Sequence, residues 1–107
     1  MAFYIKQNDT SPFISATLKD ADGNAIDLTS TTIRFHMRVI GSSTATVDAA
    51  ATIINEEAGT CKYEWQAADT ATAGSYHAEF EVTYTDGNIE TFPNNDYIQV
   101  EILGAIA

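Results

Sequence analysis

The sequence has few residues of several kinds, and each shortage narrows the classes of protein to which it can belong. Cys61 is the only cysteine, so an internal disulfide is excluded, which fits folding in a reducing cytoplasm. A lone cysteine on a strand is usually a small buried hydrophobic residue rather than a catalytic thiol. Only five basic residues stand against fifteen acidic ones, and the resulting net charge of −10 makes nucleic acids and anionic membranes poor partners. That charge favours solubility, or alternatively a basic protein partner.

Long apolar runs and catalytic motifs are missing as well. Residues 1–9 contain no basic stretch leading into an apolar one, so no signal peptide is expected, and no apolar run approaches the roughly 20 residues of a membrane span. No G-x-S-x-G, P-loop, G-x-G-x-x-G or zinc-ligand spacing occurs. Glu56 and Glu57 are adjacent, so they cannot face each other as an acid–base pair on one strand. We therefore expect no enzyme, no cofactor and no resident metal.

The chain does contain apolar residues that alternate with polar ones at a period of two. Residues 75–84, SYHAEFEVTY, show this best, because their apolar side chains all fall on one face. Half-buried strands have this pattern. The same alternation occurs in residues 13–19, 32–39, 61–65 and 97–102.

Turn-forming residues separate these runs. Asp86 and Gly87 lie between two alternating runs, and an Asp-Gly pair supplies the positive φ of a tight hairpin. Residues 40–43 and 56–59 are further breaks. Residues 92–97, FPNNDY, are expected to interrupt the last strand with a bulge or bend.

Two segments are less clear, but the fold class does not depend on them. Residues 46–53 are alanine-rich and compatible with a helix, although neighbouring strands favour one strand there. Residues 66–74, QAADTATAG, are compatible with a short helical turn. About seven short strands without a long helix predict an all-β fold, an immunoglobulin-like antiparallel β-sandwich, with residues 1–107 as a single domain.

Gly74 and Tyr76 stand just before the strongest predicted strand. Immunoglobulin-like folds place a tyrosine at this point and bond its hydroxyl back to the preceding corner, so Tyr76 fits a tyrosine corner. Asp69 lies seven residues earlier, which is further than in antibody domains, and Cys61 has no disulfide partner. An ordinary core tyrosine is the alternative.

An acidic stretch at residues 20–24 resembles the start of a calcium loop. Asp20, Asp22 and Asn24 match EF-hand loop positions 1, 3 and 5, but Ala25 replaces the glycine of position 6 and Thr31 replaces the glutamate of position 12. Without these two residues the loop should not close around an ion. A turn between strands explains the same residues.

The two histidines, His36 and His77, both fall on outward faces of predicted strands. His77, Glu79 and Glu81 would follow one another at ~7 Å steps along one strand. A straight row of this kind does not converge on a metal ion, so a solvated face is expected rather than an opportunistic metal site.

The last residues, 103–107, form an uncharged apolar tail. Leu103 and Ile106 have no obvious place in a core, so the tail either docks on a partner or packs locally. Aromatic residues are expected to fill the core first, with any surplus available to an interface. These aromatic residues are Tyr4, Tyr63, Trp65, Phe92 and Tyr97.

Residues 3–38 and 59–102 resemble the N-terminal domain of siphophage baseplate upper proteins. The most specific pieces are IKQNDTSP, LKDADGNAIDLT, AGSYHAEFEVTYTDGNIETFPN and YIQVEI, in this order and spacing, whereas residues 41–57 match poorly. The resemblance implies an immunoglobulin-like virion component that packs against other virion proteins without catalysis. Asn8 stands where family members commonly have glycine, and asparagine tolerates the positive φ expected there.

Two functions are therefore predicted. The first is a non-enzymatic virion structural protein, assembled in the host bacterial cytoplasm, which joins a symmetric assembly through a sheet edge or an apolar terminus. Baseplate upper proteins continue into segments that hold receptor-binding proteins, whereas this sequence stops at Ala107. A tail or baseplate adaptor, a neck protein and a capsid decoration protein therefore all remain open. The second function is a soluble binding module for a small ligand such as carbohydrate or calcium.

Overall fold

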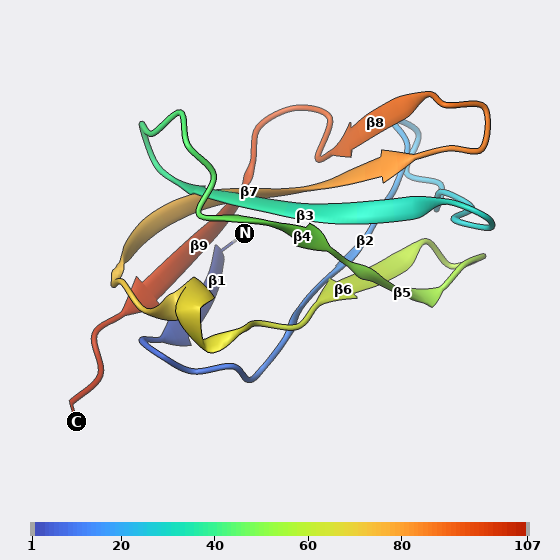
Figure 1. Ribbon diagram of the computed structural model, residues 1–107. Helices are drawn as coiled ribbons and strands as arrows, with labels where there is room; N and C mark the ends of the chain where they lie inside the picture. Colours follow the sequence, from blue (N-terminus) through green and yellow to red (C-terminus); the bar gives the residue numbers. More distant parts are fainter. Residues whose placement is uncertain (1, 107) are drawn as a thin grey trace.

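The computed structural model describes residues 2–106, and strands dominate it (Figure 1). Within these residues nine strands form two sheets, and one short 3-10 helix, η1 (Ala67–Thr70), precedes the longest strand. The smaller sheet consists of β2 (Ile14–Thr17), β5 (Thr52–Asn55) and β6 (Thr60–Tyr63). The larger sheet consists of β1 (Ala2–Lys6), β3 (Thr32–Val39), β4 (Val47–Ala50), β7 (Gly74–Thr83), β8 (Ile89–Phe92) and β9 (Ile98–Leu103).

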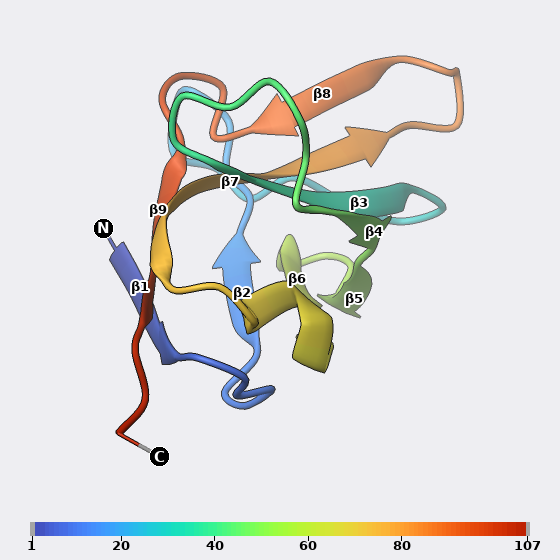
Figure 2. The same ribbon diagram turned by 60° about the vertical axis from the view of Figure 1, so that its left-hand side comes forward.

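The two sheets lie face to face, as Figures 1 and 2 show. Their buried apolar residues form one core cluster. The strand order is β1-β9-β7-β3-β4 in the larger sheet, with β8 also paired to β7, and β2-β6-β5 in the smaller one. The predicted all-β, immunoglobulin-like sandwich is confirmed. One pair departs from the antiparallel pattern, because β1 runs parallel to β9. The predicted helical turn at residues 66–74 is present as η1.

The prediction of one strand at residues 46–53 is wrong. The segment is extended, but it is divided between β4 in the larger sheet and β5 in the smaller one. Ala51 marks the crossing, and its amide donates to the carbonyl of Ile33 at 2.8 Å. The alternation of buried and exposed residues continues unbroken through Ala51, so periodicity alone could not reveal the change of sheet.

The prediction that residues 92–97 interrupt the last strand is confirmed, because β8 and β9 run in the same direction along one edge of β7 and residues 93–97 are left out of the pairing. The segment separates two strands, because β8 ends at Phe92 and β9 begins at Ile98. Both strands pair with the same edge of β7, where Phe92 lies opposite Phe80 and Ile98 lies opposite Ala78. The ten residues of β7 are long enough to hold two short neighbours in succession.

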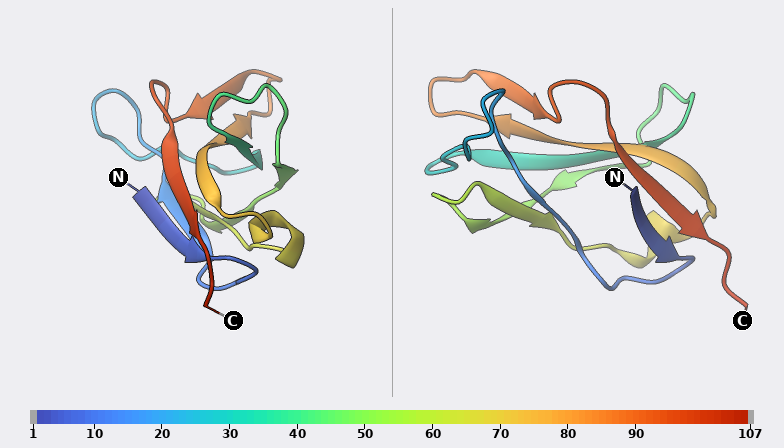
Figure 3. Two further views of the ribbon diagram at one scale, coloured as in Figure 1. Left: turned by 90° about the vertical axis from the view of Figure 1, so that its left-hand side faces the viewer. Right: turned by 180° about the vertical axis from the view of Figure 1, so that it is seen from behind.

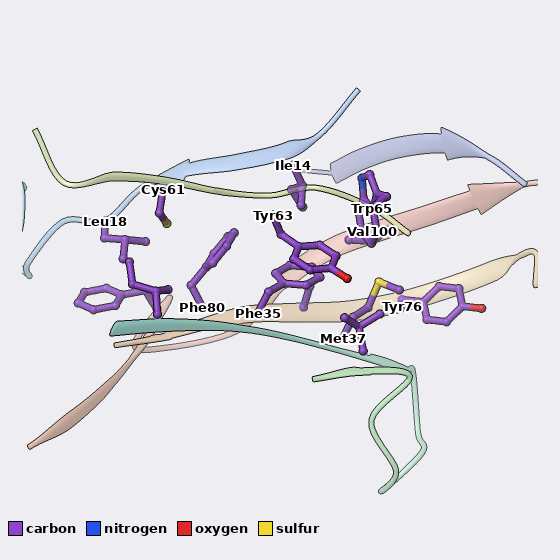
Figure 4. Packing of buried hydrophobic residues seen from close by; sticks show 14 of the residues in the cluster. Ile14, Leu18, Phe35, Met37, Cys61, Tyr63, Trp65, Tyr76, Phe80 and Val100 are labelled. Atoms are coloured by element: carbon purple, nitrogen blue, oxygen red, sulfur yellow. The ribbon is translucent and has the colours of Figure 1, made fainter. Parts of the chain in front are cut away.

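Aromatic rings from both sheets meet in the core, as Figure 4 shows. The ring of Phe35 stacks on Tyr63 with centroids 4.7 Å apart, meets Trp65 edge-on at 5.5 Å and lies 5.1 Å from Phe80. Tyr63, Trp65 and Phe92 are buried, as the sequence predicts. The solvent reaches the other two aromatic residues, Tyr4 and Tyr97, which are the surplus that the core does not use.

The acidic stretch at residues 20–24 forms the predicted turn. Oδ1 of Asp20 accepts hydrogen bonds from the amides of Asp22 and Asn24, both at 2.9 Å, and Lys19 bridges to Ala25. The Asp20 carboxylate therefore stabilises the backbone of its own turn. Across residues 2–106, no group of three or more His, Cys, Asp or Glu side chains is placed to hold a metal ion. No helix in that range is long and apolar enough to cross a membrane.

Cys61 is fully buried, as expected for a small hydrophobic residue, and burial raises the pKa of its thiol to about 12. Unfolding returns that pKa to its ordinary value of 9.0, so the unfolded state loses the proton first. This thiol therefore supports the fold fully below pH 9.0 and progressively less as the pH rises toward about 12.

We expect Cys61 to be inert toward a disulfide labelling reagent at neutral pH in the native protein and to react completely in denaturant. Absorbance of the released thiolate measures the reaction. Rapid labelling of the native protein would contradict the buried position of this residue.

Candidate functional site

Strand β1 forms an open edge of the larger sheet. Its strand neighbour is β9, and among residues 2–106 no strand pairs with its other side. Phe3 and Ile5 turn toward the core, where Phe3 lies 5.8 Å from Trp65. Tyr4 and Lys6 turn outward. The sequence AFYIK is a continuous apolar run before Lys6, so it carries no alternation that would have predicted which side chains face the core.

Three exposed apolar side chains lie on β1 and at or beyond the end of β9, and we call them the edge patch: Tyr4, Leu103 and Ile106. Their exposed fractions are 62%, 42% and 103%. The parallel register places Tyr4 opposite Glu101, so Leu103 is its diagonal neighbour on the same outer face. Ile106 follows beyond the end of β9, where the chain extends away from the sandwich (Figure 3).

The predicted tail at residues 103–107 begins one residue later than expected. Leu103 is the last residue of β9, and its carbonyl accepts a hydrogen bond from the amide of Gln7 at 2.7 Å. Its backbone is therefore held in the sheet while its side chain stays exposed. Ala107, the last residue of the predicted tail, lies outside the described residues.

Hydrogen bonds to η1 fix the chain where it leaves β1. The amide of Asn8 donates to the carbonyl of Thr70 at 2.9 Å, and the buried hydroxyl of Thr70 donates to the carbonyl of Asp9 at 2.8 Å. Asn8 adopts a φ of 69°, which confirms the positive φ expected there. These bonds keep β1 and the edge patch in a defined position.

Tyr76 and Gly74 lie on β7, the strand that pairs with β9 on the side opposite to β1. Gly74 begins β7 opposite Ile102 of β9, and Tyr76 lies opposite Val100. The Tyr76 hydroxyl donates to the carbonyl of Thr72 at 2.6 Å, which is the bond predicted for a tyrosine corner. Tyr76 is buried, so its side chain stabilises the core and is not part of the exposed surface at this edge.

The change Tyr76→Phe removes this hydrogen bond and leaves the carbonyl of Thr72 without that donor. We expect the free energy of unfolding to fall by about 1 kcal/mol. The control Tyr4→Phe alters an exposed hydroxyl and should change stability by less than ~0.5 kcal/mol. Urea denaturation of the unaltered protein and the two variants measures the difference in stability. Equal midpoints for all three proteins would contradict a structural role for the Tyr76 hydrogen bond.

Asp86 and Gly87 form the hairpin between β7 and β8, at the opposite end of the molecule from the edge patch (Figure 1). Gly87 has a φ of 89°, and Oδ1 of Asp86 accepts from the amide of Asn88 at 2.9 Å. The loop spans three residues between Tyr84 and Asn88, and these two form its closing bond. Both residues thus shape a turn that is separate from the edge.

His36 and His77 do lie on the outer face, as predicted, but both have protein partners. His36 lies between two carboxylates, with Nε2 3.2 Å from Asp48 Oδ1 and Nδ1 3.5 Å from Glu79 Oε2. Arg34 bonds the same Asp48 oxygen at 2.8 Å and lowers the pKa of that carboxyl. His36 thus belongs to a network of polar contacts across three strands rather than to a simply solvated face.

The described residues thus form a small immunoglobulin-like sandwich with an open, apolar strand edge. The model of the BppU N-terminal domain family matches residues 3–93, and the chain belongs to this family. The resemblance noted from the sequence is thereby confirmed. Membership indicates a structural protein of the phage baseplate type and hence a virion component.

A solved structure with a similar fold is that of CopC from Methylosinus trichosporium OB3b. The two chains superpose with a TM-score of 0.55 over 99% of this chain and 87% of that one, at 11% sequence identity. At such low identity the likeness supports the sandwich fold alone. No curated protein matches the sequence.

Proposed function

We propose that this chain is a structural protein of a bacteriophage particle that attaches to another virion subunit through the edge patch. The observation that carries the proposal is the exposure of Tyr4 on β1, a strand with one unpaired side, together with that of Leu103 and Ile106 at and beyond the end of the neighbouring β9. Proteins usually protect an open strand edge with charges, bulges or a covering segment. Here Lys6 is the charged residue of β1, and exposed apolar groups at such an edge favour a contact with another protein.

The edge suits a partner that contributes an extended segment. Such a segment would pair with the free backbone groups of β1 and lay its own apolar side chains over Tyr4 and Leu103. Main-chain bonds would supply affinity, and the side chains would supply specificity. Ile106 would extend the contact beyond the end of the sheet.

The family favours a place in the tail or baseplate over the neck and the capsid surface. In this proposal residues 1–107 act as one domain, assembled with the particle in the host cytoplasm. A symmetric particle repeats each contact, so that copies held at several positions gain avidity from individually weak interfaces.

Incorporation into particles tests the proposal. The double variant Tyr4→Ser/Ile106→Ser removes two apolar side chains of the edge patch, whereas Ile89→Ser removes an equally exposed one at the far hairpin. Both are supplied in trans to a phage that lacks the gene. We expect roughly tenfold less of the double variant in purified particles, as loss of about 1.4 kcal/mol of binding would give, and a normal amount of Ile89→Ser. Equal incorporation of both variants would refute attachment through this edge.

A further inference from the structure

A trough crosses the outer face of the larger sheet, on the side turned away from the smaller sheet. The β3–β4 and β8–β9 loops rise on either side of it (Figures 1 and 2). One part has a volume of about 410 Å³, and a second part of about 630 Å³ adjoins it, since Glu79 and Tyr97 line both. We call the two parts the outer trough. Hollows of roughly 300–1,000 Å³ are typical of small-molecule sites.

Tyr97 provides a flat apolar surface in this trough. Its ring stacks on His77 with centroids 4.7 Å apart and an interplanar angle of 11°, and the guanidinium carbon of Arg38 lies 5.6 Å from its centroid. Arg38 and His77 are opposite neighbours on β3 and β7, so both approach Tyr97 from the sheet. Despite these two contacts, Tyr97 keeps an exposed fraction of 42%.

Polar groups around Tyr97 are already fixed by bonds to one another. His36 lies between Asp48 and Glu79, and Arg34 holds Asp48 from the side. In the adjoining part, the side-chain amide nitrogen of Asn94, Nδ2, donates to the backbone carbonyl of Thr91 at 2.9 Å. Side chains fixed in this way lose little further freedom when a ligand binds, so their hydrogen bonds to it cost less entropy.

The charges of the trough favour an uncharged ligand. The trough contains three carboxylates, those of Asp48, Glu79 and Asp96, and its cationic side chain is Arg38. An anion would therefore be repelled by these carboxylates and by the net charge of −10 of the protein. A cation would compete with Arg34 and His36, which already contact Asp48 and Glu79. A neutral molecule rich in hydroxyl groups can bond to the same carboxylates, amides and imidazole without displacing their partners.

We propose that the outer trough binds a neutral carbohydrate, with one sugar ring packed on the exposed part of the Tyr97 ring. The apolar C–H face of the sugar covers the aromatic ring, while its hydroxyls donate to Glu79 and to the polar side chains of residues 94–96. This site is separate from the edge patch, so attachment to the particle and sugar binding can take place together.

Titration of the labelled protein with sugars, followed by two-dimensional NMR, tests this site. The probes are maltotriose, lactose and tri-N-acetylchitotriose, each to roughly 20 mM, which detects millimolar affinities. At least one should shift the amide signals of residues that line the trough, in a saturable manner. Tyr97→Ala should weaken that binding roughly tenfold, as loss of a stacking contact would, and Tyr97→Phe should retain it.

The matched control is Tyr4→Ala, which removes the exposed tyrosine of the edge patch and should bind sugar as the unaltered protein does. Circular dichroism establishes that each variant keeps its fold. The proposal is overturned if none of the three probes shifts the trough signals, or if Tyr97→Ala binds as tightly as the unaltered protein.

Discussion

Replacing Phe35 with alanine lowers the free energy of unfolding by about 3–5 kcal/mol, the largest effect expected from a single side chain here. Phe35 is fully buried and lies against Tyr63, Trp65 and Phe80, so its ring joins the two sheets. Its removal leaves a cavity that neither sheet can fill without moving. A protein of this size has roughly 5–15 kcal/mol of stability in total, so the variant should be near the limit of folding.

Urea denaturation measures this loss through the fluorescence of Trp65, the only tryptophan, which meets Phe35 edge-on. Val39→Ala is the control, because Val39 lies on the same strand with an exposed fraction of 46%. We expect the control to lose less than ~1 kcal/mol. A Phe35→Ala protein as stable as the control would mean that the two sheets are not joined through this ring.

Gly59→Ala should be the second most damaging change, with a loss of more than ~3 kcal/mol. Gly59 has a φ of +68°, and an added Cβ would lie 2.7 Å from the carbonyl oxygen of Ile26 and 2.9 Å from that of Leu18. Both atoms belong to the backbone, which cannot rotate away as a side chain would. The amide of Leu18 also donates to the carbonyl of Gly59 at 2.8 Å, so a displaced Gly59 loses this bond too.

Gly23→Ala provides a control with the same kind of backbone but without the crowding. Its φ is +84°, and an added Cβ meets no atom within 4 Å. The control should lose only the ~1–2 kcal/mol that left-handed backbone costs a residue with a Cβ. Thermal unfolding compares the two variants. Equal losses would show that the close approach of residues 18 and 26 to Gly59 does not exist in solution.

The alternation of apolar and polar residues predicts those strands that have one buried face and one solvent-exposed face. Phe35 and Phe80 illustrate this, since each is buried between outward-facing polar neighbours on β3 and β7. Alternation does not tell which sheet a strand joins. The chain changes sheets at Ala51 without a break in the pattern. This change depends on pairing between distant residues, which local pattern does not encode.

The edge and the trough were predictable to different degrees. Leu103 and Ile106 stand out in the sequence because no alternating run needs them in the core, and both are exposed. Tyr4 is missed when aromatic residues are assigned to the core by type rather than by strand face. Tyr97 contacts His77 and Arg38 only when β3, β7 and the β8–β9 loop come together. No spacing of residues in the sequence could therefore have predicted this cluster.

A density map of the purified phage particle tests the central claim most directly. The account predicts an immunoglobulin-like sandwich in the map, with β1 and the end of β9 pressed against a different virion subunit so that Tyr4 and Leu103 are covered. A particle without this sandwich, or one in which that edge faces open solvent at every copy, would contradict it.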